Sequence, residues 1–236
     1  IIAITGSNGK TTTTTLIAQI LKKAGHQVCL CGNIGSPLAA YVLGLEKSDV
    51  VVLEISSFQL ESTIQFKPYV AVWLNFSQNH LDRHKDLDEY FQAKKKIFQN
   101  QEQTDFAILN DQQAEFKSLA KELKAHILWF NGLDKSCDIT NPNYLAALTA
   151  VKAFGIAEDV SRQVFKEFKG VEHRLELVRT LNGVDYINDS KSTTAQAGRW
   201  ALERLDKPGI MICGGSDKHI DYEELKSLVA QKVKYM

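Results

Sequence analysis

The residues with the clearest chemical pattern lie at the start of the chain, in a polar turn that two glycines bracket. This turn and the residues after it comprise Gly6, Ser7, Asn8, Gly9, Lys10, Thr11 and Thr12. Glycines allow backbone N–H groups to face an anion, while Lys10 can reach the β- and γ-phosphates of a nucleotide and the Thr11 hydroxyl can ligate Mg²⁺. The pattern departs from the usual G-x-x-x-x-G-K-[ST] because Ile4 occupies the position of the first glycine. It therefore predicts a variant phosphate-binding loop for ATP or GTP.

Two flanking elements must position this loop. A β-branched apolar run, residues 1–4, predicts a buried parallel strand before it, and apolar residues recur at helical spacing from Leu16 to Leu21 after it. A strand, a glycine turn and a helix form the context that the motif requires, because a helix N-terminus favours a bound anion. A Gly-Lys-Thr sequence without these flanking elements would carry no such prediction.

Three further polar residues lie where a parallel sheet could bring them to the same loop. Glu54 ends the predicted strand 49–55, His80 lies in the polar loop after the predicted strand 69–74, and Lys94 belongs to a run of three lysines in a predicted helix. Ligands of open α/β sheets bind beyond the carboxyl ends of the strands. The structural alternatives are a charge that merely emerges at a strand end, for Glu54, and a solvated helix face, for the lysine run. The residues alone indicate a magnesium-dependent nucleotide enzyme.

Strand-like and helix-like segments alternate along most of the chain. The predicted strands are residues 1–4, 27–31, 49–55, 69–74, 105–109 and 126–130. This alternation predicts an α/β fold, a P-loop-type, mostly parallel sheet with helices on both faces, and one of its helices is expected from Pro37 towards Leu43. Beyond a domain boundary at residue 170, a hairpin with an Asn182-Gly183 turn and a final strand, loop and helix predict part of a Rossmann-like α/β C-terminal domain.

Composition narrows the class of protein. The chain of 236 residues has 28 basic and 28 acidic residues and is 44% hydrophobic, so no excess of positive charge favours nucleic acid as a partner. The longest apolar runs have the length of strands, and none could span a membrane. The four cysteines follow no disulfide or zinc pattern and indicate reduced thiols in the cytoplasm. A cytoplasmic monomer fits this balance of charge.

Eight short motifs occur in the order that they have in the Mur ligases: TGSNGKTTT, GNIGSP, LEISSFQLE, LNFSQNHLDRH, YFQAKKKIF, EHRLE, INDSKST and GGSDK. The sequence resembles this family from Ile1 to about Lys218. The resemblance implies an ATP- and Mg²⁺-dependent amide ligase of peptidoglycan synthesis. It is closest to the member that adds D-glutamate to UDP-N-acetylmuramoyl-L-alanine through an acyl phosphate. Residues 1–170 would then be the ATP-binding central domain, and residues 171–236 part of the C-terminal ligase domain.

The resemblance also assigns roles to single residues. The catalytic set would be Lys10, which binds the transferred phosphate, together with His80 and Lys94. The ligands of Mg²⁺ would be Thr11, Glu54, His80 and Lys94, the last carbamylated, because an ammonium cannot coordinate a cation. Adenine, the γ-phosphate and the ribose would be contacted by Asn143, Arg174 and Asp189, respectively. The muramoyl substrate, the amino acid and the acyl group would be contacted by Asn33, Ser190, Lys191, Thr193 and Lys218.

Parts of the family pattern are missing from the sequence. The family's uridine-binding domain would precede Ile1, and the last part of its C-terminal domain would follow Met236, so we expect the chain to be a piece of a longer protein. The family's His-Asn pair before Asn143 is replaced by Ile139 and Thr140. Two alternatives to a ligase stay open, namely a non-catalytic ATP-binding fragment and a P-loop NTPase that hydrolyses ATP without a ligase substrate.

Overall fold

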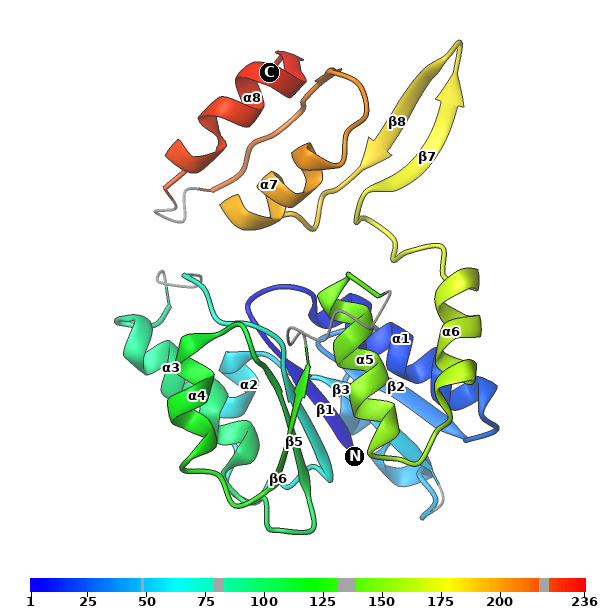
Figure 1. Ribbon diagram of the computed structural model, residues 1–236, viewed down its shortest axis with the longest axis vertical. Helices are drawn as coiled ribbons and strands as arrows, with labels where there is room; N and C mark the ends of the chain where they lie inside the picture. The colour runs from blue at the N-terminus through cyan, green and yellow to red at the C-terminus, as the bar shows by residue number, and fades with distance from the viewer. Residues whose placement is uncertain (48, 79–82, 131–138, 217–220) are drawn as a thin grey trace. The chain divides into compact units, whose positions relative to one another are not determined.

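The computed structural model describes residues 1–47, 49–78, 83–130, 139–216 and 221–236. The chain forms two compact units (Figure 1). The first consists of Ile1–Ser77 and Asp86–Lys169, and the second of Gln78–Lys85 and Gly170–Met236. None of the described helices is long and apolar enough to cross a membrane.

A six-stranded sheet organises the first unit. Its strands are β1 (Ile2–Thr5), β2 (Val28–Gly32), β3 (Val50–Glu54), β4 (Val70–Trp73), β5 (Phe106–Asn110) and β6 (His126–Phe130). Their order is β2-β3-β1-β4-β5-β6, and every neighbouring pair is parallel. The register pairs Ile4 of β1 with Glu54 on one side and with Val72 on the other. The carboxyl ends of β1, β3 and β4 therefore meet at one edge of the sheet, as the sequence predicts.

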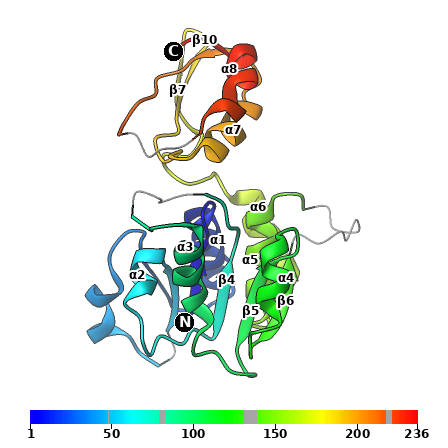
Figure 2. The same ribbon diagram turned by 90° about the vertical axis from the view of Figure 1, so that its left-hand side faces the viewer.

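Helices cover both faces of this sheet, which confirms the predicted fold class (Figures 1 and 2). One face carries α1 (Lys10–Lys23), α5 (Pro142–Lys152) and α6 (Glu158–Glu167), and the other carries α2 (Ser57–Glu61), α3 (Leu87–Lys95) and α4 (Ala114–Ala120). Successive side chains of a strand point to opposite faces. Ile2 and Ile4 accordingly join the core under α1, while Ala3 joins the core on the other face.

An aromatic cluster fixes α3 and α4 to their face of the sheet. Trp73, at the end of β4, is fully buried, and its ring centroid lies 4.8 Å from those of Phe91 in α3 and Phe116 in α4. Aromatic pairs at such distances add to the stabilisation that burial alone provides. This packing sets the position of α3, the helix that carries Lys94.

The predicted helix from Pro37 towards Leu43 is wrong. This segment forms two short 3₁₀ turns, η1 (Leu38–Ala40) and η2 (Val42–Gly44), and neither buries a residue. The side chain of Leu43 is fully exposed. Because most helical stability in proteins comes from packing an apolar face, a segment without a buried face does not extend beyond single turns.

The second unit contains short sheets and helices. The hairpin consists of β7 (Glu176–Leu181) and β8 (Val184–Asn188), and positive φ angles at Asn182 (51°) and Gly183 (76°) form its turn, as predicted. The remaining elements are α7 (Ala195–Glu203), β9 (Gly209–Ile210), η4 (Glu223–Leu225), α8 (Lys226–Lys232) and β10 (Val233–Tyr235). β10 pairs in parallel with β9, and β9, the final strand that the sequence predicts, has only two residues.

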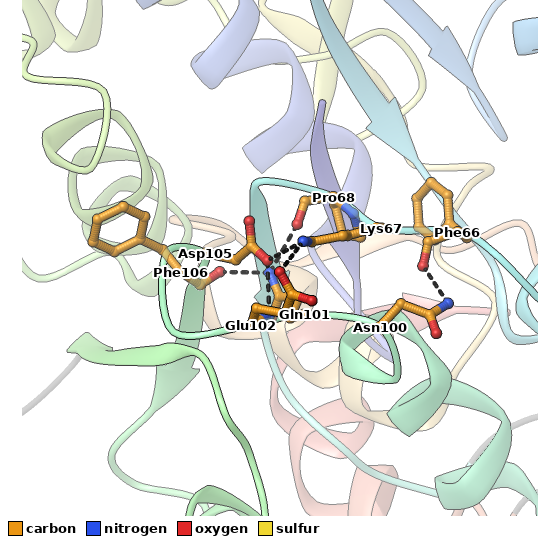
Figure 3. Close-up of polar contacts among 8 residues, drawn as sticks. All are labelled: Phe66, Lys67, Pro68, Asn100, Gln101, Glu102, Asp105 and Phe106. Carbon is orange, nitrogen blue, oxygen red and sulfur yellow. Dashed lines mark hydrogen bonds and ion pairs between the residues drawn. The ribbon is translucent and has the colours of Figure 1, made fainter.

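A polar cluster lies at the amino ends of β4 and β5, and we call it the amino-edge cluster (Figure 3). Its members are Lys67, Asn100, Gln101, Glu102 and Asp105. The Lys67 ammonium lies 2.7 Å from Glu102 and 3.4 Å from Asp105, and the buried Gln101 amide donates to two backbone carbonyls, each at 3.0 Å. Asn100 donates to two further carbonyls. These bonds join the loop before β4 to the loop before β5.

Candidate nucleotide and metal site

The glycine loop connects β1 to α1 and leaves the first turn of α1 without a side-chain cap. Gly9 is the N-cap residue and has a left-handed backbone (φ 82°), and a Cβ at this position would collide with the side chain of Asn143. In contrast, Ser56, Asp86 and Asn141 cap α2, α3 and α5 with their side chains. The first amides of a helix have no partner within the helix. The start of α1 therefore presents backbone donors beside Gly9 and Asn143, where an anion fits.

Lys10 folds back over the loop. Its ammonium donates to the carbonyl of Gly6 at 3.0 Å and to that of Ser7 at 3.2 Å. Both acceptors are neutral, so an anionic ligand would be a stronger partner for this ammonium than the two carbonyls. Thr11, the next residue, is buried within the first turn of α1.

A network of polar contacts supports the loop, and most of its members, Asn75, Ser77 and Tyr90, are not among the predicted site residues. The Ser7 N–H donates to the carbonyl of Asn75, and the Asn8 N–H donates to the Asn75 side chain at 2.8 Å. The Ser7 hydroxyl donates to the carbonyl of Ser77 and accepts from its N–H, both at 3.0 Å. With its only hydrogen used in this way, Ser7 must accept the 3.2 Å bond from the Tyr90 hydroxyl.

The one signal that could have indicated Tyr90 is its spacing. It lies four residues before Lys94, and residues at i and i+4 share a face of a helix. The bonds of Asn75, Ser77 and Tyr90 to the loop join residues 67 to 83 positions apart in the chain. No periodicity or local motif encodes such contacts.

Lys94 is buried beneath the same loop. Only 1% of it is exposed, and its ammonium donates to the Gly6 carbonyl at 3.1 Å and to the Thr5 hydroxyl at 3.3 Å. The ring of Tyr90 lies 4.7 Å from this ammonium. Burial, and to a smaller extent the nearby Lys10 ammonium, hold the pKa of Lys94 well below its usual value. Lys94 therefore loses its proton to give the neutral amine more easily than a surface lysine does.

The two lysines that follow have ordinary surroundings. Lys95 forms an ion pair with Glu122 on the surface, and Lys96 donates to the backbone carbonyl of Glu61. The solvated helix face that is the structural alternative for the lysine run therefore describes Lys95 and Lys96 but not Lys94.

Glu54 ends β3 next to the glycine loop, and only 2% of it is exposed. Its Oε1 accepts a 3.0 Å hydrogen bond from the Asn33 side chain. Its Oε2 is buried and has no hydrogen-bond partner among the described residues. A buried carboxylate oxygen without a donor is costly, and a bound cation would compensate that cost.

No group of three His, Cys, Asp or Glu side chains gathers in the part of the chain that the structure describes. A cation at this edge would instead rely on Glu54 together with hydroxyl and lysine side chains. Glu54, Thr11 and Lys94 all lie on the elements that meet at the glycine loop. The predicted ligand His80 and the predicted substrate contact Lys218 lie outside the described residues.

Other predicted contact residues belong to the second unit. Ser190, Lys191 and Thr193 follow β8. Arg174 lies between His173 (φ 66°) and Leu175 (φ 44°), a strained backbone of the kind that occurs at functional sites. Asp189 accepts a 3.0 Å bond from the Leu175 N–H. Burial raises the pKa of Asp189, and this hydrogen bond opposes the shift.

Comparison with known proteins places the chain in a family. The model of the Mur ligase middle domain matches residues 4–174. The UDP-N-acetylmuramoylalanine–D-glutamate ligase of Caldicellulosiruptor saccharolyticus is 40% identical over 99% of this chain and 59% of its own length, and that of Lawsonia intracellularis is 42% identical over 99% and 54%. The chain thus spans somewhat more than half the length of these curated relatives.

A solved structure shows the same fold at lower sequence identity. A crystal structure of MurF from Acinetobacter baumannii aligns with a TM-score of 0.72 and 20% identity, covering 89% of this chain and 55% of that one. The family model covers well over half of the chain and includes the glycine loop, Glu54, Lys94 and Asn143. The chain therefore belongs to the Mur ligase family.

Proposed function

We propose that this chain is the ATP-binding core and part of the C-terminal domain of an ATP-dependent amide ligase that adds D-glutamate to UDP-N-acetylmuramoyl-L-alanine in peptidoglycan synthesis. The observation that carries the proposal is the convergence of Lys10 and Lys94 on the Gly6 carbonyl of the glycine loop. The names of the relatives point to the same reaction. In this proposal residues 1–170 are the ATP-binding central domain, and residues 171–236 are the partial ligase domain.

ATP binds with its phosphates at the loop from Gly6 to Thr12. The first amides of α1 and the Lys10 ammonium supply the donors, while Ser7 and Asn8 maintain the shape of the loop through Asn75 and Tyr90. Asn143, packed on Gly9, contacts the adenine, and Arg174 and Asp189 contact the γ-phosphate and the ribose. The γ-phosphate of ATP would pass to the muramoyl carboxylate, with ADP as the leaving group. The amine of D-glutamate would then attack the acyl phosphate, which forms the amide and releases phosphate and a proton.

Mg²⁺ is held by Thr11, Glu54, His80 and a carbamylated Lys94. The unpartnered Oε2 of Glu54 fits a cation, whereas the ammonium of Lys94 does not. In the carbamylation the neutral amine forms an N–C bond with CO₂ and loses a proton, which leaves an anionic oxygen ligand in place of a cation. When bound, Mg²⁺ neutralises charge on the phosphates. The buried, easily neutralised amine of Lys94 supports this assignment.

The remaining substrates are small molecules. Asn33 contacts the muramoyl substrate. The amino acid and the acyl group are contacted by Ser190, Lys191, Thr193 and Lys218. We propose that the protein acts as a monomer in the cytoplasm.

Calorimetry with Mg²⁺ and ATP tests the nucleotide site on this chain. Lys10→Ala should weaken ATP binding, because each charge-assisted contact to phosphate that is lost contributes about 1.5–3 kcal/mol. Lys22→Ala, at the other end of α1, is the matched control and should bind ATP as the wild type does. Equal affinity of the wild type and Lys10→Ala would mean that the loop is not the phosphate site.

Phosphate release tests the reaction in a ligase that contains this segment together with the flanking domains of its relatives. We expect release to require both UDP-N-acetylmuramoyl-L-alanine and D-glutamate. Rapid ATP hydrolysis with neither substrate present would instead favour an NTPase without a ligase substrate.

A further inference from the structure

The ends of β2 and β3 are built closely around Glu54. Gly32 is paired with Glu54 in the sheet, and the Asn33 N–H donates to the Glu54 carbonyl at 2.9 Å. The Asn33 side chain then turns to the carboxylate, where its Nδ2 donates to Oε1 at 3.0 Å. One residue therefore holds Glu54 by its backbone and by its side chain.

The close approach depends on the glycine before Asn33. Gly32 has a left-handed φ of 108°, and a Cβ at this position would collide with the Glu54 backbone carbonyl. Only glycine adopts this left-handed φ without strain and has no Cβ to collide with the carbonyl. The turn thus brings the Asn33 amide to the carboxylate by backbone geometry that other residues do not adopt easily.

The two oxygens of Glu54 have different surroundings. Oε1 has the Asn33 donor, while the buried Oε2 has no hydrogen-bond partner among the described residues. A donor on one oxygen limits rotation of the carboxylate and leaves the other oxygen as the ligating atom. Groups that hold a metal ligand in this way commonly change metal affinity by 10- to 100-fold when they are removed.

We propose that Asn33 is a positioning residue that orients Glu54 so that Oε2 faces the metal site. The inference rests on the proposed role of Glu54 as a metal ligand, and it gives Asn33 a task that is independent of the muramoyl substrate. Asn33 itself is exposed, and its amide contacts Oε1 and not Oε2.

Electron paramagnetic resonance of Mn²⁺, with a non-hydrolysable ATP analogue and no muramoyl substrate, tests the proposal on this chain. We expect Asn33→Ala and Glu54→Gln each to raise the dissociation constant of Mn²⁺ about tenfold or more. Because Asn33 acts through Glu54, the double variant should bind Mn²⁺ no more weakly than Glu54→Gln alone.

Asn100→Ala is the matched control. It also removes an asparagine amide that donates at 2.7 and 3.0 Å, but in the amino-edge cluster, and Mn²⁺ affinity should not change. Asn33→Ala should still fold, because the backbone bond from Asn33 to Glu54 remains, although the loss of the donor to Oε1 should lower the free energy of unfolding.

The outcomes distinguish the positioning role of Asn33 from the role of Glu54 as a metal ligand. Unchanged Mn²⁺ affinity in Asn33→Ala, or effects of the two substitutions that add, would overturn the positioning role while leaving Glu54 as a ligand. Unchanged Mn²⁺ affinity in Glu54→Gln would overturn the metal site itself and the inference with it.

Discussion

Polar side chains lie at both edges of the parallel sheet in the first unit, but the contacts of these side chains differ. In the amino-edge cluster the charges of Lys67, Glu102 and Asp105 are paired, and Gln101 donates to two carbonyls. At the opposite edge the carboxylate oxygen Oε2 of Glu54 has no hydrogen-bond partner among the described residues, and the Lys94 ammonium has only neutral acceptors there.

This difference helps to distinguish structural from functional polar groups. The amino edge also leaves one buried atom without a described partner, Oε1 of Gln101. That atom belongs to a neutral amide whose nitrogen donates two hydrogen bonds. Leaving a buried charge unpaired costs far more than leaving an amide oxygen unpaired. An edge that retains such charges is therefore the one where a ligand is expected to supply the missing partners.

The largest effect should follow from removing the buried lysine at the carboxyl edge. In a ligase with its flanking domains, Lys94→Ala should abolish ligation, whereas Lys95→Ala, which removes a surface ion pair, should be mild. A short-chain carboxylic acid should partly restore the ligation activity of Lys94→Ala, because it can supply the missing anionic oxygens. Equal losses from both substitutions, without rescue, would show that the lysine run acts as bulk charge.

At the amino edge the expected effect is on stability alone. Gln101→Leu should lower the free energy of unfolding by about 2 kcal/mol, since the carbonyls of Pro68 and Phe106 lose the buried Gln101 amide as their donor. Urea unfolding measures this change, and ATP affinity should stay as in the wild type. A loss of ATP affinity without a loss of stability would contradict the structural role of this cluster.

Glu54→Gln should have a smaller effect on the free energy of unfolding, and this effect should be an increase. The amide oxygen can still accept the hydrogen bond from Asn33, and the substitution removes a buried charge. The free energy of unfolding should therefore rise by about 1 kcal/mol in the absence of metal. Urea unfolding of the two proteins in a chelator measures the difference. A clear decrease in stability would indicate that the carboxylate has a partner within the fold and that the contrast between the two edges is weaker than proposed.

The sequence predicted the elements of the first unit well because local patterns encode them. Strands β1 to β6 are apolar runs of strand length, and Gly-Lys-Thr between a strand and a helix locates the start of α1. The segment after Pro37 is apolar in the same way, yet it forms only 3₁₀ turns. Its composition does not reveal that none of the residues of these turns becomes fully buried.

The contacts within the site could be predicted only in part. The resemblance selected Lys94 from three consecutive lysines, and Lys94 is the buried one, although its modification stays a prediction. The bonds of Tyr90 to Ser7 and of Asn33 to Glu54 join side chains 83 and 21 positions apart. Such pairs depend on how helices and strands pack, which residue spacing alone does not determine.

The position of β1 in the sheet has a consequence for the synthesis of the protein. β1 is the first of the six strands to be made but lies between β3 and β4, so the edge that pairs with β4 stays without a partner until residues near Trp73 have left the ribosome. At about 5–20 residues per second, translation from β1 to β4 takes on the order of 3–13 s. During this interval at least one edge of the apolar strand β1 is unpaired, a feature that promotes aggregation. Chaperones that bind nascent chains would protect the segment that later positions the phosphate loop.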